Sequence, residues 1–326
     1  MPSLVLAKTI ENVILKNYGE YINLFEEFQS EFLIGLNRTY QGLENGHLVL
    51  YFAKKTHHTI LRKKDYDLDF NLSFDRFWEN QTHMENEPTT IIDISKNVFL
   101  PKETTRRKIS ELISQKVLNR KLKIIEWFPS EKYKKSYNEA MVKEITQIAK
   151  LVKYVSEKIN LNVPHDDIER EFKNKFSFYW FHYLDAQLQY LKLWKKHFND
   201  LEIILIALQV SILVASKVKK GDVSHAAIFS NDTKIISDIY SSDSVNVSVS
   251  SISEITGIPR ATCIRKLNLM VKLKIINQDN LTRRYYITSD AFSLKLVSSQ
   301  TTKNVVKVFS EFFSICIKTI NFKSAS

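Results

Sequence analysis

The chain is 326 residues long, 44% hydrophobic and 25% charged, a composition that excludes a disordered or fibrous protein and allows two domains with separate cores. Six glycines and six prolines indicate a mainly helical fold with short connections. Two cysteines are too few for a disulfide framework, so we expect a soluble, cytoplasmic protein. The longest uncharged apolar run, residues 203–216, is too short to span a bilayer and predicts a buried helix.

The net charge of +11 lies in two segments of the chain. Residues 94–123 contain nine basic and two acidic side chains, and residues 252–284 contain seven basic and two acidic ones. The remainder of the chain is close to neutral, so the excess positive charge is confined to these two segments. A charge concentrated in this way indicates a polyanionic partner, such as DNA.

Helical patterns follow one another on both sides of a short break at residues 160–164. In the first half, the predicted helices are residues 4–37, 43–62, 74–84 and 130–159. In the second half, the predicted helices are residues 165–198, 201–218, 233–240 and 289–320. Each basic segment precedes the last helix of its half, and we therefore expect two domains in chain order, residues 1–159 and 160–326.

The two basic segments are similar in sequence. Residues 94–118, ISKNVFLPKETTRRKISELISQKVL, align without a gap with residues 252–276, ISEITGIPRATCIRKLNLMVKLKII, and seven of the 25 positions are identical. The repeat offset is 158 residues, and a weaker match between EWFPSEKY and YYITSDAF continues at an offset of 159. A match that tolerates one extra residue in a loop is typical of a duplicated structural unit.

The second segment has the pattern of two helices joined by a tight turn. Ser251 and Glu254 fit a capping box, which predicts a helix start near Ile252. Gly257 is suited to end this helix in a left-handed conformation, and Pro259 to the first turn of the next helix. The side chains that share the predicted inward face of the second helix are Cys263, Leu267, Met270 and Val271.

A β-hairpin pattern follows each pair of helices, at residues 119–128 and 277–288. In this context ITGIPRATCIRKLNLMVKLKII resembles the helix-turn-helix of bacterial winged-helix transcription regulators of the MarR-like and IclR-like kind. The resemblance is specific for the fold and less so for the individual regulator. It implies a mainly α fold with small β-hairpin wings, in which two winged helix-turn-helix domains are flanked by long helices and related by internal duplication.

The family places its second helix in the major groove of double-stranded DNA and its wing on the backbone. By position, the resemblance implies that Arg260, Thr262 and Arg265 face the groove in the second copy, with Lys266, Arg283 and Arg284 near phosphates. In the first copy, the implied DNA-binding residues are Lys102, Thr104, Arg106, Arg107, Lys108, Arg120 and Lys121. The glycines do not cluster into a phosphate-binding loop or a dinucleotide-binding motif. We expect no catalytic site, no metal and no cofactor.

The first copy departs from the pattern at the turn. Phe99 stands where the second copy has Gly257, and Asn97 replaces the apolar Ile255. We therefore expect a longer or differently shaped turn in the first copy. The predicted inward face of its second helix consists of Thr105, Ile109, Leu112 and Ile113.

Three other features allow more than one interpretation. The aromatic run FSFYWFHYL at residues 176–184 favours packed core over a ligand pocket or a base-stacking surface. Residues 305–317 predict an apolar helix that packs against the long helices and allows further self-association. Cys263 is expected in the core, although basic neighbours could lower the pKa of its thiol.

Regulators of this type bind DNA as symmetric dimers, which place two recognition helices about one DNA turn apart. Two winged helices in one chain favour a regulator that binds in this way as a single chain. Because the copies differ, we expect its site to consist of two unlike half-sites. A plasmid-type replication initiator and a tandem winged-helix scaffold for protein partners are the alternatives. The basic segments argue against the scaffold, which has no need of them.

Overall fold

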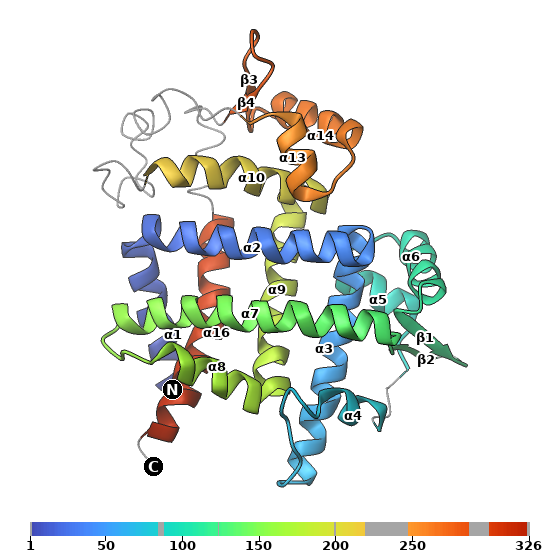
Figure 1. Cartoon of the computed structure of the whole chain (residues 1–326), viewed down its shortest axis with the longest axis vertical. Coiled ribbons are helices and arrows are strands. Elements are labelled where there is room, and N and C mark those ends of the chain that lie inside the picture. The colour runs from blue at the N-terminus through green and yellow to red at the C-terminus, as the bar shows by residue number, and fades with distance from the viewer. Residues whose placement is uncertain are drawn as a thin grey trace. The chain divides into compact units, whose positions relative to one another are not determined.

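The computed structural model describes residues 2–83, 88–122, 124–198, 200–218, 247–286 and 300–324. These residues form thirteen helices, one β-hairpin and one shorter antiparallel ladder (Figure 1). The prediction of a mainly helical fold is confirmed, and it is accompanied by one small antiparallel β-hairpin. No helix within the described ranges is long and apolar enough to cross a lipid bilayer. The predicted helix at residues 233–240 lies outside the described residues.

The first half of the chain forms seven helices and the β-hairpin. In chain order they are α1 (Pro2–Lys16), α2 (Tyr18–Tyr40), α3 (Leu43–Tyr66), α4 (Phe77–Thr82), α5 (Ile91–Val98), α6 (Lys102–Ser114), β1 (Leu118–Lys121), β2 (Ile124–Trp127) and α7 (Glu131–Lys158). The helix predicted at residues 4–37 is two helices, because the chain turns at Asn17, whose side-chain amide donates to the Val13 carbonyl at 2.8 Å.

The second half forms a similar series. In chain order its described elements are α8 (His165–Asn174), α9 (Phe176–Phe198), α10 (Leu201–Val218), α13 (Val249–Thr256), α14 (Arg260–Lys272), β3 (Asn277–Gln278), β4 (Tyr285–Tyr286) and α16 (Gln300–Ser324). The helix predicted at residues 165–198 is interrupted at Lys175, between α8 and α9. The start of the helix predicted at residues 289–320 lies outside the described residues.

The element bounds of the two halves correspond at the repeat offset. Helices α2 and α9 begin and end at this spacing, and so do α5 and α13 and also α6 and α14. Helices α3 and α10 begin at the same spacing. The offset found in the basic segments therefore extends to the long helices that precede them.

The chain folds into two compact units that exchange helices between the sequence halves. The first unit contains Thr39–Lys192, and thus α3 to α8 with most of α9, together with residues 1–7 and 308–326. The second unit contains Lys8–Arg38, and thus most of α2, together with residues 193–307. These units do not follow the division at residue 160, which therefore stays a prediction about the sequence repeat.

In the first unit, α5 and α6 pack on α3, and the β-hairpin packs on α3 and α6 (Figure 1). The hairpin contributes Trp127 to an aromatic core with Phe77 and Phe176, and all three side chains are at most 2% exposed. His57 lies in the same core, stacked on Phe77 with ring centroids 4.6 Å apart. Burial lowers the pKa of His57 to about 3, so this imidazole stays neutral and acts as a core side chain.

In the second unit, α13 and α14 pack on α10 (Figure 1). Helix α10 is buried as its apolar sequence predicts, with Leu205 and Ile206 at 0% exposure. The end of α2 supports α13, because the Asn37 amide donates to the Thr256 carbonyl at 3.0 Å. Arg38 adds a hydrogen bond from its guanidinium to the Ile255 carbonyl at 2.8 Å. Helix α2 thus supplies hydrogen bonds to the last orphan carbonyls of α13.

Candidate nucleic-acid interface

The first basic segment folds as two helices joined by a tight turn. Thr90 caps α5, with its hydroxyl accepting a hydrogen bond from the Asp93 amide at 3.1 Å. The helix ends at Phe99, which is left-handed with φ 53° and ψ 43°. The Leu100 amide then donates to the Ser95 carbonyl at 3.2 Å, and Pro101 is the N-cap of α6.

The second basic segment has the same local geometry. Helix α13 begins at Val249 and is capped by Ser248, whose hydroxyl accepts from the Ser251 amide at 3.0 Å. The predicted capping box at Ser251 is therefore wrong, because the cap lies one helical turn earlier. The left-handed conformation of Gly257 is confirmed, with φ 73°. Pro259 is the N-cap of α14 and precedes the first helical residue by one position.

The prediction of a different turn in the first copy is wrong. Phe99 adopts the left-handed conformation that Gly257 has in the second copy. A side chain in this conformation costs roughly 1–2 kcal/mol, which the surrounding packing must offset. The exchange of Ile255 for Asn97 does not disturb the helix, because both side chains are exposed.

The inward faces of α6 and α14 are those predicted from their periodicity. Thr105, Ile109 and Leu112 are at 0% exposure in α6, and so are Cys263, Leu267 and Met270 in α14. Ile113 and Val271 are half-buried at the edge of each face. Burial raises the pKa of the Cys263 thiol, so the idea of a basic environment that lowers it is wrong.

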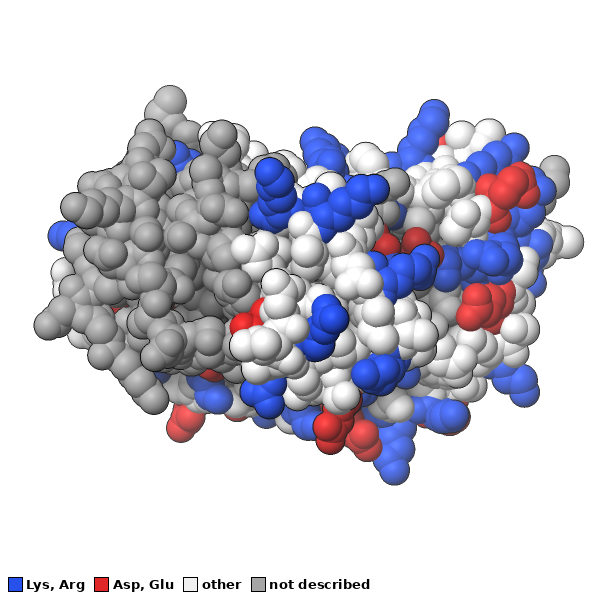
Figure 2. Space-filling model, turned by 90° about the horizontal axis from the view of Figure 1, so that it is seen from above, with Lys and Arg blue, Asp and Glu red and all other residues white. Residues whose placement is uncertain are grey.

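The outward faces of both helices carry arginine and lysine side chains. Arg107 and Arg265, at equivalent positions, are exposed, and neither has an ion-pair partner among the described residues. The other exposed basic side chains of these helices, predicted from the sequence, are Lys102, Arg106 and Arg260, while Thr104 and Thr262 are half-buried. Lys and Arg side chains (blue) dominate over Asp and Glu (red) on the face of the molecule drawn in Figure 2.

Lys108 and Lys266 do not belong to this outward face. The Lys266 ammonium forms ion pairs with Asp200 and with Glu202, the latter at 2.9 Å, and its side chain is 10% exposed. Burial lowers the pKa of Lys266, but the hydrogen bonds and charges of the two carboxylates raise it above its usual value. Lys108 pairs in the same way with Glu44 at 3.3 Å.

These ion pairs attach each second helix to the start of α3 or α10. Glu44 and Glu202 are related by the repeat offset, as are Lys108 and Lys266, so the two bridges join equivalent positions. The matching positions of Glu44 and Glu202 can be found by aligning the two halves of the sequence beyond the basic segments. We therefore leave both lysines out of the proposed DNA-binding residues.

The first hairpin presents basic side chains beside an exposed tip. Arg120 pairs with Ile125 and Lys121 with Ile124 across the ladder, and both basic side chains are exposed. Leu122 at the tip is 97% exposed. Lys121 also lies 3.4 Å from the Glu126 carboxylate, which reduces the charge it offers a phosphate.

The second ladder is shorter and its turn is held by one carboxylate. Asn277 pairs with Tyr286 and Gln278 with Tyr285, and residues 287 and 288 lie outside the described residues. Asp279 accepts hydrogen bonds from the Leu281 and Thr282 amides, and the bonds to Thr282 contribute most to lowering its pKa. The sequence-predicted wing residues Arg283 and Arg284 follow this turn and are exposed.

The aromatic run at residues 176–184 is mainly core, as favoured from the sequence. Phe176, Tyr179, Trp180 and Tyr183 are at 0% exposure. Phe181 differs, since it points into a hollow with basic side chains on its wall. Among the described residues, no three His, Cys, Asp or Glu side chains are grouped so as to hold a metal ion.

Comparisons of this chain with family models, curated proteins and solved structures found no match.

Proposed function

We propose that the chain is a transcription regulator that binds double-stranded DNA through two winged helices. The observation that carries the proposal is the pair Arg107 and Arg265. Both stand at the same position of a short second helix, exposed and without a carboxylate partner among the described residues, while the opposite face is buried. Arginine so placed can form bidentate contacts to guanine in the major groove, which discriminate by about 1–3 kcal/mol.

We infer that the two winged helices arose by internal duplication. The left-handed turn residue, the proline N-cap and the lysine–glutamate bridge all recur at the repeat offset. Finer bonds recur as well, since the Ser95 hydroxyl donates to the Leu100 carbonyl at 2.9 Å and the Ser253 hydroxyl donates to the Ile258 carbonyl at 2.7 Å. Unrelated helix pairs would share the turn but have no reason to share the bridge.

In this proposal α6 and α14 each enter a major groove, and Arg120, Lys121, Arg283 and Arg284 contact the backbone from the wings. One chain then does the work of a regulator dimer. The helices differ in what they offer to bases, because Arg106 of α6 corresponds to Ile264 of α14. The preferred DNA would accordingly contain two unlike half-sites.

The test is fluorescence anisotropy with random-sequence duplex DNA over a series of salt concentrations. Affinity should fall steeply with salt, by a slope of about 0.9 per phosphate contacted. On random-sequence DNA, where no guanine contact is selected, the two arginines contact phosphates, so Arg107→Ala and Arg265→Ala should each reduce that slope by about 1. Lys150→Ala on α7 is the control, because it removes another exposed positive charge, outside both winged helices, and should leave the slope unchanged.

Failure to bind DNA at low salt would remove this proposal and favour the protein-interaction scaffold. A change of slope in one variant alone would restrict DNA binding to that half. A plasmid-type replication initiator would share the binding behaviour, and the sites selected from genomic and plasmid DNA would distinguish it.

A further inference from the structure

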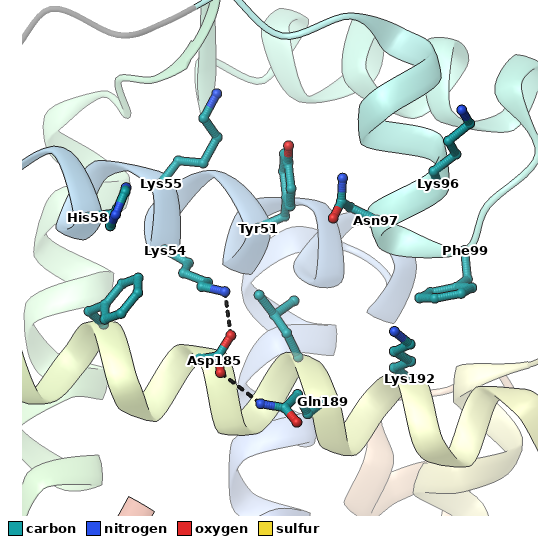
Figure 3. A pocket seen from close by; sticks show the side chains of 12 residues that line it. Tyr51, Lys54, Lys55, His58, Lys96, Asn97, Phe99, Asp185, Gln189 and Lys192 are labelled. Atoms are coloured by element: carbon teal, nitrogen blue, oxygen red, sulfur yellow. Dashed lines mark hydrogen bonds and ion pairs between the residues drawn. The ribbon is translucent and has the colours of Figure 1, made fainter. Parts of the chain in front are cut away.

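A hollow with a volume of about 440 Å³ lies among α3, α5 and α9 in the first unit (Figure 3). Its size is within the range of small-molecule pockets. One face of α3, including Tyr51 and Lys54, forms one wall, and one face of α9, including Phe181 and Lys192, forms another. The end of α5 borders it through Lys96, Asn97 and Phe99.

Positive charge prevails in the hollow. Lys54, Lys55, Lys96 and Lys192 line it, and Asp185 is the carboxylate among the lining residues. Lys54 points from α3 to Asp185, with which it forms an ion pair, and Gln189 donates a second hydrogen bond to this carboxylate at 2.7 Å (Figure 3). Asp185 can balance one ammonium group, so the lining keeps an excess of positive charge that favours an anion.

An aromatic surface adjoins the lysines. The Phe99 ring is 41% exposed and lies 5.0 Å from the Lys192 ammonium. Phe181 on the opposite wall stacks on His58 with ring centroids 5.4 Å apart. Phe99 keeps this position in the left-handed conformation of the turn that joins α5 and α6.

The equivalent positions of the second half lack these basic and aromatic side chains, although α10 and α13 begin at the positions equivalent to the starts of α3 and α5. At the repeat offset, Lys54, Lys55, Lys96 and Phe99 correspond to Ile212, Leu213, Glu254 and Gly257. The lysines and the ring therefore belong to the first half alone and are not a shared feature of the two halves.

We propose that the hollow binds a small phosphate monoester with a planar ring, which is the chemistry of a nucleoside monophosphate. A phosphate monoester carries a charge of roughly −1.5 to −2 at pH 7, which the excess positive charge of the lining can neutralise. The ring then lies against Phe99, whose 41% exposed side chain offers a stacking surface beside Lys192. A simple carboxylate has about half this charge and would leave more of the positive charge of the lining unmatched.

The ligand would contact the turn that places α6. Phe99 is the C-cap of α5, and the next residue, Leu100, closes the turn through its hydrogen bond to Ser95. A ligand held by Lys96 and Phe99 thus restrains the start of the proposed recognition helix. The effect on DNA rests on the proposed function, and by linkage DNA must change the affinity for the ligand by the same factor.

The experiment is calorimetric titration of the full chain, without DNA, with the 5′-monophosphates of adenosine, guanosine, cytidine and uridine and with inorganic phosphate. We expect at least one nucleotide to bind. The double variant Lys96→Gln/Lys192→Gln should weaken that binding at least tenfold. Lys150→Gln on α7 is the control for a lysine charge lost outside the hollow, and its affinity should equal that of the wild type.

Phe99→Gly tests the contribution of the Phe99 ring independently of the lysine charges. Glycine accepts the left-handed conformation, so the turn is kept while the stacking surface is lost. Nucleotide binding should weaken and the weaker binding of inorganic phosphate should remain. The proposal is overturned if none of the four nucleotides binds at millimolar concentration, or if both sets of pocket variants bind as the wild type does.

A second titration, of DNA by anisotropy with and without the bound nucleotide, keeps the two proposals distinct. Nucleotide binding without any DNA binding would refute the proposed function and leave the site intact. Loss of DNA affinity in Lys96→Gln/Lys192→Gln, with no nucleotide bound by the wild type, would assign the hollow to the DNA backbone and refute the ligand site.

Discussion

Adjacent residues of α14 should respond in opposite ways to substitution. Arg265 is exposed, whereas the Lys266 side chain is 10% exposed and bridges to Asp200 and Glu202. We expect Lys266→Met to destabilise the fold and to leave the salt dependence of DNA binding unchanged. Arg265→Ala should do the reverse. The pair therefore tests the division between structural and DNA-facing basic residues.

The size of the stability loss in Lys266→Met depends on the exposure of Asp200 and Glu202. Breaking a fully buried pair costs about 3–5 kcal/mol, whereas an exposed pair contributes at most about 1 kcal/mol. Asp200 and Glu202 are each 31% exposed, so water can hydrate the carboxylates once the ammonium is gone. Methionine retains the packing of the lysine stem, and we expect Lys266→Met to lower the free energy of unfolding by about 1–3 kcal/mol.

Urea unfolding monitored by circular dichroism measures this change, as a lower midpoint at an unchanged m-value. Arg265→Ala should stay within about 0.5 kcal/mol of the wild type, as surface substitutions usually do. A Lys266→Met protein of wild-type stability whose salt slope falls by about 1 would refute the reasoning, because the lysine would then contact phosphate and not the carboxylates.

Three further predictions concern stability. Burial raises the pKa of Glu144 to about 8, and a hydrogen bond with Tyr183 opposes this shift, so the folded state favours the protonated acid. The free energy of unfolding should therefore fall as the pH rises from 4.5 to about 8. Urea titrations at several pH values would measure this dependence, which Glu144→Gln should flatten. Gly257→Ala should lower the free energy of unfolding by about 1 kcal/mol, because alanine disfavours the left-handed φ of this position. The added Cβ would lie 3.6 Å from Arg38, an ordinary contact distance, so a larger loss in thermal unfolding would contradict this prediction. Thr90→Ala should cost about 1 kcal/mol by removing the N-cap of α5, and an unchanged unfolding midpoint would show that the cap is replaced by water.

The sequence predicts those features that depend on local periodicity and turn chemistry. The inward faces of α6 and α14 and the left-handed Gly257 follow from helical spacing and from the conformational freedom of glycine. The prediction failed at Phe99, because this residue adopts a left-handed conformation that phenylalanine disfavours in isolation, with its ring beside the Lys192 ammonium of α9. The burial of Lys266 was not predicted either, since its partners Asp200 and Glu202 lie outside the basic segment.

The hollow was beyond prediction for a related reason. Lys54 and Lys96 are distant in sequence from Asp185 and Lys192, and no motif joins them. The lining residues of α9 recur at helical spacing, but that pattern alone is equally typical of a solvated helix face. Their meeting depends on α9 packing in the unit formed mainly by the first half of the chain.

That exchange of helices predicts that neither sequence half folds alone. Residues 1–159 would lack α9, which supplies Asp185 to Lys54 and packs Lys192 against Phe99. Residues 160–326 would lack α2, whose Asn37 holds the end of α13. We expect each fragment to show little cooperative unfolding, and co-expression of both to restore a complex with wild-type helicity and one thermal transition. A cooperative transition in isolated residues 1–159 would instead mean that α9 only covers a unit stable without it, and the division at residue 160 would then be a true domain boundary.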